Sequence, residues 1–132
     1  AAVNFINDEG LLMAPAYAVS DMLKQANLRL QDFDFYEIHE AFAAQTVATL
    51  KAWQSEKFCR ERLGRNEPMG PIDLSRLNVK GGSIAMGHPF AATGARIMGA
   101  LAKMLGEKGS GRGLISVCTA GGMGVSAIME AA

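Results

Sequence analysis

A chain of 132 residues, of which 49% are hydrophobic, is long enough to form one domain with its own core. Its 13 basic and 13 acidic residues cancel and form no basic stripe, which argues against a nucleic-acid surface held mainly by phosphate contacts. The longest apolar stretches are interrupted well before the roughly 18 residues of a membrane span, so we expect no transmembrane segment.

The N-terminal part of the chain predicts a strand, a turn and a helix. Residues 3–6 are rich in strand-forming side chains, and residues 7–10 have the composition of a turn. A helix is predicted over residues 14–26, where apolar side chains recur at helical spacing. Pro15 suits the first turn of this helix, and Asn27 can adopt the left-handed conformation that ends it.

The middle of the chain predicts a second strand and a second helix. Alternating apolar and acidic residues indicate a short strand over residues 33–38, and residues 41–53 have a helical pattern. His39 and Glu40 lie at the junction of the two. Residues 55–77 are mixed in charge and rich in Gly and Pro, so we expect them to form an excursion from the regular fold.

The C-terminal part predicts a helix and a hairpin. The helix covers residues 92–106, and three of its apolar side chains are expected to share one face: Met98, Leu101 and Leu105. Residues 114–118 and 125–129 are β-prone and are separated by a glycine-rich turn, which is typical of neighbouring antiparallel strands. Strands that alternate with helices in this way predict an α/β domain over residues 1–132.

His88 and Cys118 are the strongest candidates for chemistry. His88 follows Gly81-Gly82-Ser83-Ile84-Ala85-Met86-Gly87, and Cys118 ends an apolar run just before Thr119-Ala120-Gly121-Gly122. Such turns expose side chains and allow backbone N–H groups to point at a bound oxyanion, so the pair is typical of acid–base chemistry. The structural alternative is that the glycines only shape turns and that Cys118 packs as a small hydrophobe.

Other polar residues have simpler interpretations. His39 and Glu40 can satisfy backbone groups where a strand meets a helix, and Cys59 lies in a charged stretch with no partner motif. The spacing of the two His and two Cys residues lacks the close pairs of a zinc site, and no Gly-x-Gly-x-x-Gly joins a strand to a helix. Two cysteines without a secretory signal favour a reducing intracellular setting.

Three segments together resemble the C-terminal signature blocks of the thiolases. The blocks are His39-Glu40-Ala41-Phe42, Gly81-Gly82-Ser83-Ile84-Ala85-Met86-Gly87-His88-Pro89-Phe90-Ala91-Ala92-Thr93-Gly94-Ala95-Arg96 and Cys118-Thr119-Ala120-Gly121-Gly122-Met123-Gly124. His39 in place of the commoner asparagine is similar to the fatty-acid-oxidation branch that includes the trifunctional-complex β-subunit. The resemblance implies the thiolase C-terminal half, with a mixed sheet of about five strands and helices packed on it.

The resemblance also implies a role for each residue of the blocks. Thiolases cleave 3-ketoacyl-CoA with CoA, or condense two acyl-CoA molecules, through an acyl-cysteine. His88 then corresponds to the histidine that activates the nucleophile, and Cys118 to the cysteine that exchanges a proton with the substrate α-carbon. His39 and Ala120 correspond to the two oxyanion holes. Four further residues correspond to substrate-binding positions: Ala41, Phe42, Met86 and Gly87.

The family's nucleophilic cysteine has no counterpart in this chain. We therefore expect a domain of a longer enzyme that is inactive alone and needs the nucleophile-bearing N-terminal half as its partner. The resemblance implies CoA and acyl-CoA as substrates, no cofactor or metal, a homo-oligomer, and a cytoplasmic location in bacteria or a mitochondrial or peroxisomal one in eukaryotes.

Two alternatives stay open from the sequence. The chain could be a non-catalytic docking or oligomerisation domain, which would expose an apolar patch. It could also belong to a condensing enzyme of the ketoacyl-synthase type, although those enzymes generally carry histidine or asparagine where this chain has Cys118.

Overall fold

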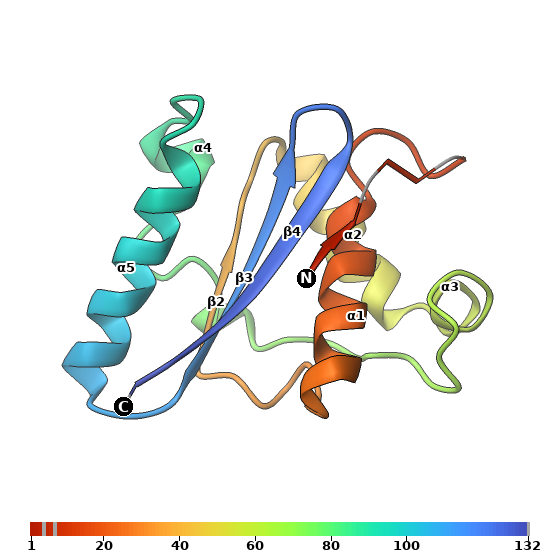
Figure 1. Cartoon of the computed structure of the whole chain (residues 1–132), viewed down its shortest axis with the longest axis horizontal. Helices are drawn as coiled ribbons and strands as arrows, with labels where there is room; N and C mark the ends of the chain where they lie inside the picture. The colour runs from red at the N-terminus through yellow and green to blue at the C-terminus, as the bar shows by residue number, and fades with distance from the viewer. Residues whose placement is uncertain (4, 7, 132) are drawn as a thin grey trace.

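A four-stranded mixed sheet forms the centre of the molecule (Figure 1). The computed structural model describes residues 1–3, 5–6 and 8–131. The strands are β1 (Ala2–Val3), β2 (Phe35–Ile38), β3 (Arg112–Thr119) and β4 (Met123–Glu130), in the order β1-β4-β3-β2. Strand β2 pairs with β3 in parallel, whereas β3 with β4 and β4 with β1 are antiparallel. The mixed α/β sheet is thus confirmed, with four strands where about five were expected.

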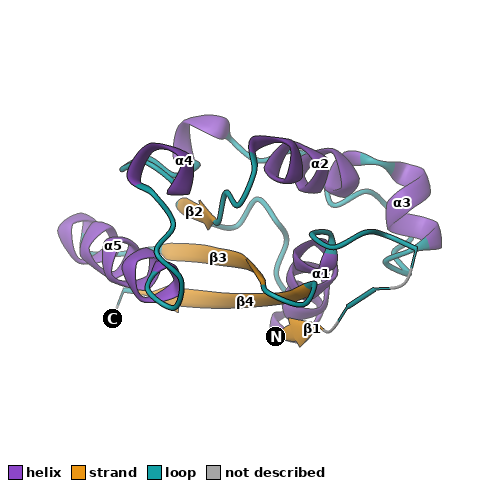
Figure 2. Cartoon of the chain, turned by 90° about the horizontal axis from the view of Figure 1, so that it is seen from above, coloured by secondary structure: helices purple, strands orange, loops and turns teal. Residues whose placement is uncertain are grey.

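Helices cover both faces of this sheet (Figure 2). Helices α1 (Ala14–Ala26) and α2 (Ala43–Gln54) pack on one face, and α5 (Thr93–Lys108) packs on the other. The larger apolar cluster lies on the α1 side and contains Tyr36, Ile38 and the fully buried Trp53. The smaller cluster joins α5 to Ile115 and Phe35. Alternate residues of β2 thus serve different layers.

Most predicted elements are confirmed, with one difference near the N-terminus. Asn27 has φ 54° and caps α1, and the β3–β4 hairpin turns through Gly121 and Gly122, both with φ near 80°. The strand predicted over residues 3–6 is wrong beyond Val3, because β1 ends there; Asn4 lies outside the described residues, as does Asn7 of the predicted turn.

The predicted buried face of α5 requires one correction. Met98 is 53% exposed, whereas Leu101 and Leu105 are buried as expected. The buried side chains follow a different stripe of the helix, namely Ile97, Leu101, Met104 and Leu105. Met98 lies next to Ile97 in sequence and is rotated by about 100° from it around the helix, which places Met98 at the margin of that stripe beside Leu105.

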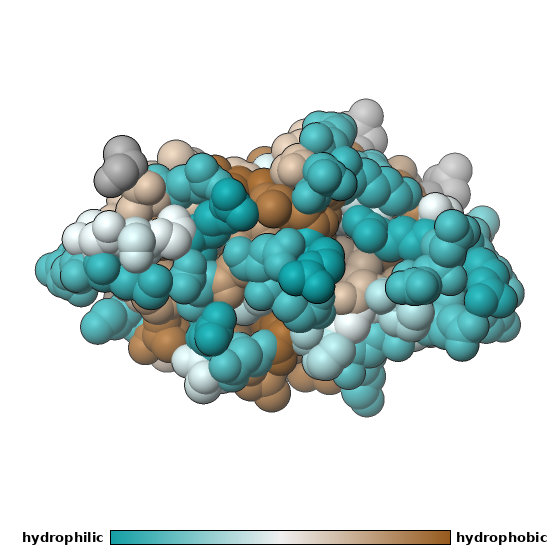
Figure 3. All heavy atoms as spheres, turned by 90° about the horizontal axis from the view of Figure 1, so that it is seen from below, coloured by the Kyte–Doolittle hydropathy of each residue, from teal (hydrophilic) through white to brown (hydrophobic). Residues whose placement is uncertain are grey.

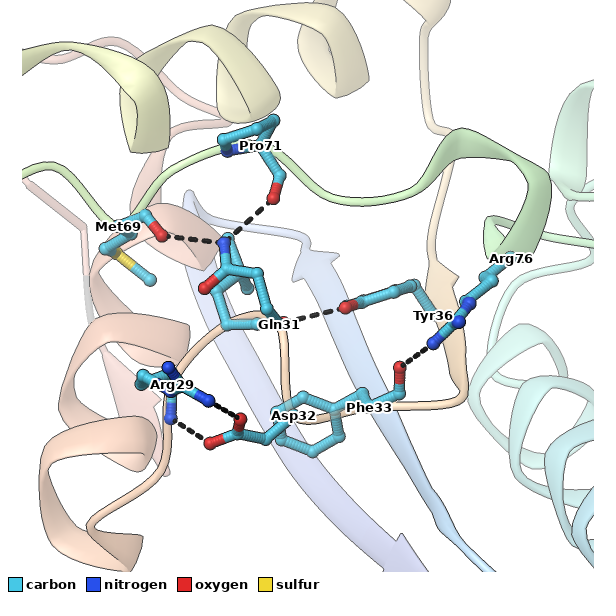
Figure 4. A network of polar contacts seen from close by, with 9 residues as sticks. Arg29, Gln31, Asp32, Phe33, Tyr36, Met69, Pro71 and Arg76 are labelled. Carbon is cyan, nitrogen blue, oxygen red and sulfur yellow. Dashed lines mark hydrogen bonds and ion pairs between the residues drawn. The ribbon is translucent and has the colours of Figure 1, made fainter.

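The excursion at residues 55–77 contains two short helices, α3 (Glu56–Glu61) and η1 (Leu74–Arg76), and is fastened to the loop before β2 (Figure 4). The Gln31 amide donates to the carbonyl oxygens of Met69 and Pro71, at 2.9 and 2.8 Å. The Arg76 guanidinium donates to the Phe33 carbonyl at 3.2 Å. These bonds satisfy backbone groups that a long irregular segment would otherwise leave open.

Helix α1 approaches β4 at Gly124 more closely than any side chain would allow. A Cβ at this position would overlap with the backbone of Ala14 and Pro15, where the helix begins.

Among the helices in the described part of the chain, none is both long and apolar enough to cross a membrane.

Candidate active site

The ends of two parallel strands bring His39 and Cys118 to one edge of the sheet. His39 follows β2 directly, and its backbone N–H donates to the Ser116 carbonyl of β3 at 2.8 Å. Cys118 lies near the end of the same strand β3. The carboxyl edge of parallel strands is where α/β proteins commonly place their sites, because the loops that follow the strands converge there.

The loop that carries His88 is held in place by Glu40. The short helix α4 (Ser83–Met86) precedes His88, and the Glu40 carboxylate accepts from the Ile84 N–H at 3.1 Å. The other carboxylate oxygen accepts from the Asn78 side-chain amide at 2.7 Å. Asn78 also bonds the N–H and the C=O of Ile38, both at 2.9 Å. Glu40 therefore ties the His88 loop to the end of β2, a role beyond capping a helix.

Gly82 is required for this arrangement, because a Cβ there would overlap with the Glu40 carboxylate. We expect Gly82→Ala to displace Glu40 and to lower the free energy of unfolding by about 2 kcal/mol, in the range of a strained, overpacked site. Thermal and urea unfolding measure the change. Gly106→Ala in α5 is the matched control, since nothing lies within 4 Å of its added Cβ; an equal loss in both variants would contradict the role of Gly82.

The two imidazole rings lie against each other. The ring centroids of His39 and His88 are 4.3 Å apart, with an interplanar angle of 51°. His39 is buried, and its Nδ1 bonds the Ser83 hydroxyl at 2.8 Å, while its Nε2 has no partner among the described residues. Burial, together with the nearby His88 and Arg96, lowers the pKa of His39 against the opposing effect of Glu40. His39 is thus neutral near pH 7, with one ring nitrogen free for a ligand.

His88 is oriented by the first residue of α5. Its Nδ1 lies 2.6 Å from the hydroxyl of Thr93, and that hydroxyl donates to the Pro89 carbonyl at 3.4 Å. Because the hydroxyl proton is directed at Pro89, the oxygen can accept the Nδ1 proton of His88. This tautomer leaves His88 Nε2 with a free lone pair, which a general base requires.

Cys118 is a buried thiol rather than a thiolate. It is 6% exposed, and its Sγ lies 3.8 Å from the Gln45 side-chain oxygen. Burial raises the pKa of the Cys118 thiol, and hydrogen bonds from the backbone N–H groups of Cys118 and Ala41 only partly oppose this. A thiol with a raised pKa is protonated at neutral pH and is suited to give a proton to a carbanion.

His39, His88 and Cys118 line one cavity of about 660 Å³. Ala41 and Ala120 of the predicted site also line it, whereas Phe42, Met86 and Gly87 do not. Ala120 is not among the described non-glycine residues with positive φ, so its backbone accommodates the Cβ.

Sequence reasoning missed several walls of this cavity. Leu11, Leu12 and Thr93 line it, although none belongs to a glycine turn with a reactive side chain. For Thr93 the signal was its place five residues after His88, at the first residue of α5. Nothing in the sequence around Leu11 and Leu12 predicted that they line the cavity. They belong to the loop before α1, and only tertiary packing brings this loop to the cavity.

The family signature coincides with this geometry. The family described as thiolase, C-terminal domain, matches residues 2–131. This chain belongs to that family. The three sequence blocks that meet at the cavity are therefore part of a thiolase C-terminal domain. The resemblance found in the sequence is confirmed.

Individual relatives agree with this membership. The chain is 50% identical over 122 residues to the 3-ketoacyl-CoA thiolase of Shewanella sp. (strain W3-18-1), covering 92% of the chain and 28% of that protein. The structure of the peroxisomal 3-ketoacyl-CoA thiolase of Saccharomyces cerevisiae matches the whole chain and 33% of its own, at TM-score 0.77 and 34% identity. A dimeric peroxisomal thiolase of the same yeast matches 97% of the chain and 28% of its own, at TM-score 0.75 and 36% identity. This thiolase C-terminal domain thus spans about a third or less of these relatives.

Proposed function

We propose that the chain supplies the acid–base half of a 3-ketoacyl-CoA thiolase site. The observation that carries this proposal is the single cavity onto which a free imidazole nitrogen of His88 and the protonated thiol of Cys118 both open. Relatives at about half identity that are named 3-ketoacyl-CoA thiolases support the substrate class. Coenzyme A is a substrate in this proposal, and no cofactor takes part.

The reaction divides between the two groups. His88 Nε2 takes the proton of a nucleophilic cysteine, whose sulfur attacks the 3-keto carbon of the substrate. The bond between the α- and β-carbons then breaks, the electron pair stays on the α-carbon, and Cys118 gives its proton there to yield acetyl-CoA. The Cys118 thiolate then takes the proton of a second CoA thiol, and the sulfur of that CoA attacks the acyl-cysteine. The shortened acyl-CoA forms, and the departing nucleophilic cysteine takes back its proton from His88. In condensation each step reverses, and Cys118 as thiolate takes the α-proton.

Negative charge on substrate oxygen is stabilised at two places in this proposal. His39 presents its unpartnered Nε2 beside His88, where it holds a water or a substrate oxygen. The backbone N–H of Ala120, in the turn after Cys118, serves the second place. Ala41 lines the cavity beside them, and Phe42, Met86 and Gly87 contact the substrate only where it extends past the cavity.

The nucleophile must come from outside these 132 residues. Cys59 is fully buried and donates to the carbonyl oxygens of Ala52 and Trp53, at 3.6 and 3.4 Å, so it cannot reach substrate. We propose that an N-terminal thiolase half supplies this cysteine, that the enzyme is a homo-oligomer, and that it works in the bacterial cytoplasm or in a eukaryotic mitochondrion or peroxisome. The yeast peroxisomal 3-ketoacyl-CoA thiolase is constructed from two core domains of identical topology, which supports a second half.

Complementation tests this proposal. The purified chain should not cleave acetoacetyl-CoA, and thiolysis should appear when a separately produced, nucleophile-bearing thiolase half is added. The control is the same half with its nucleophilic cysteine replaced by alanine, which should give no activity. Thiolysis by the 132-residue chain alone would contradict the proposal.

A second prediction concerns Cys118 alone. In a complete thiolase that carries this domain, Cys118→Ala should abolish exchange of the acetyl-CoA α-protons with solvent deuterium, while acyl transfer to the nucleophile continues in part. Proton NMR follows the exchange, and mass spectrometry follows the acylated enzyme. The control is Cys59→Ala, which lies outside the cavity. Equal loss of exchange and acylation in the Cys118 variant would require another role for this thiol.

Exposed apolar side chains near the cavity support docking of this domain to the nucleophile-bearing half. Two apolar side chains that line the cavity, Leu11 and Phe90, are exposed, and the exposed Phe42 follows the lining residue Ala41 in sequence. By contrast, apolar patches on the face seen from below are separated by hydrophilic side chains (Figure 3). We propose that the nucleophile-bearing half packs on the cavity side of the domain, which would cover these side chains.

A further inference from the structure

Two opposite charges lie beneath the histidines without the partners that buried charges need. Glu37 of β2 is 1% exposed, and none of the described residues bonds its Oε1. On α5, the Nε and Nη2 atoms of Arg96 are likewise buried and unpartnered within the described structure, and its Nη1 contacts the Met86 sulfur at 3.8 Å. A buried charge without a counter-charge is strongly unfavourable, so each group calls for a partner.

The fold directs these two side chains into the same layer. Glu37 alternates with Tyr36 and Ile38 of the α1 side, so it points with Phe35 to the face that α5 covers. Its register partner on β3 is Ile115, which belongs to the apolar cluster around α5. Glu37 is thus a carboxyl group in an otherwise apolar layer, facing the helix that carries Arg96.

Arg96 of α5 is the cation whose charge acts on Glu37. Burial raises the pKa of Glu37 to about 7, the Arg96 guanidinium lowers it, and the Glu40 carboxylate raises it. Strand β3 presents the uncharged Ile115 at this level, and beyond the end of β2 the titratable groups are His39, Glu40 and His88. Arg96 also lowers the pKa of His39, so its charge acts on both the carboxyl group and the imidazole.

Both side chains belong to the segments that hold the imidazoles. Glu37 lies two residues before His39 on β2, so the two share a face of the strand. Arg96 lies one helical turn after Thr93, which orients His88, so these two share a face of α5. The distance between the two rings therefore depends on the spacing of β2 and α5 at the level of Glu37 and Arg96.

We propose that Glu37 and Arg96 are positioning residues, in which the guanidinium is the counter-charge of the carboxylate and the pair fixes β2 against α5 beneath the His39–His88 contact. The catalytic meaning of this pair rests on the proposed function. The pairing itself is a property of the folded chain and can be measured without turnover.

Side-chain NMR titration of the 132-residue chain tests the pairing. In Arg96→Met we expect the pKa of Glu37 to rise further and the pKa of His39 to rise with it, because the cation that favours the carboxylate and disfavours the imidazolium is gone. Arg96→Lys should restore both values in large part. The matched control is Arg112→Met, which removes an arginine that pairs with Glu130 at the other end of the sheet. Unchanged titration of Glu37 and His39 in Arg96→Met would overturn the proposal.

A second variant covers the case in which Arg96→Met does not fold. In Glu37→Gln the Nε–Hε resonance of Arg96 should shift, because its counter-charge has been removed while the shape of the side chain is kept. A resonance identical to that of the unmodified chain would overturn the pairing.

The kinetic consequence is read separately in a complete thiolase that carries this domain. Arg96→Met should move the acidic limb of the kcat/KM profile to higher pH, following the raised pKa of the His39 imidazole. Arg96→Lys should move this limb back. If the titrations fail while thiolysis still requires His88, the pairing is wrong and the proposed function stands. If the titrations succeed while thiolysis does not require His88, the pairing stands and the proposed function is wrong.

Discussion

Replacing His88 with alanine in a complete thiolase that carries this domain should lower kcat/KM for acetoacetyl-CoA by about 10²–10⁴-fold, the range that general base catalysis contributes. The imidazole is exposed at the cavity, and among the described residues its hydrogen-bond partner is the Thr93 hydroxyl. Its ring also lies against His39 and Phe90, so its removal takes away a proton acceptor and the packing of one exposed ring. The thermal unfolding midpoint should therefore stay within about 2 °C of the parent protein, as for other surface substitutions.

A matched control separates chemistry from general damage. Arg60→Ala removes an exposed side chain of α3 that pairs with Glu56, far from the cavity lining. Its kcat/KM should equal that of the parent. Wild-type rates of thiolysis in the His88 variant would contradict the assignment of the base, and would leave Cys118 as the group to examine next.

The largest loss of stability is expected at Gly124. In Gly124→Ala the new methyl group meets the backbone at the start of α1, which cannot move aside as a flexible side chain can. The helix must shift away from β4, and we expect the free energy of unfolding to fall by about 3 kcal/mol, at the upper end of overpacking effects. Urea denaturation followed by circular dichroism measures this loss.

Gly99→Ala is expected to have the opposite effect on the free energy of unfolding. It lies in α5 with nothing within 4 Å of an added Cβ, and alanine is a better helix former than glycine. Gly99→Ala should therefore raise the free energy of unfolding by about 0.5–1 kcal/mol. If both glycine variants were stabilising, α1 would not be in contact with β4 as described.

The sequence was informative wherever a local pattern determines a local structure. Helix ends such as Asn27 and the hairpin glycines follow from short-range sterics, and the structure has them as expected. His88 and Cys118 line one cavity, and their catalytic roles stay predictions. The place of His39 was also predictable from the thiolase resemblance. Its spacing alone favoured a capping role, because the partner ring of His88 comes from a segment about 50 residues away.

The remaining features depend on tertiary packing. Met98 and Ile97 are both apolar, and the angle at which α5 lies on the sheet decides which of them is buried. Leu11 and Leu12 line the cavity because α1 is seated against Gly124, which directs the preceding loop toward the site. No periodicity in the sequence reports such an approach between a helix and a strand.

The side chain of Asn78 has a further consequence, for self-association. Strand β2 is an edge of the sheet, and an open edge invites strands of other molecules to pair with it. Here the outward peptide groups of Tyr36 and Ile38 are already occupied by the backbone and the amide of Asn78. The opposite edge, β1, is only two residues long. On the β2 side, therefore, a strand of another molecule cannot extend the sheet, and copies of this domain are not expected to associate across that edge.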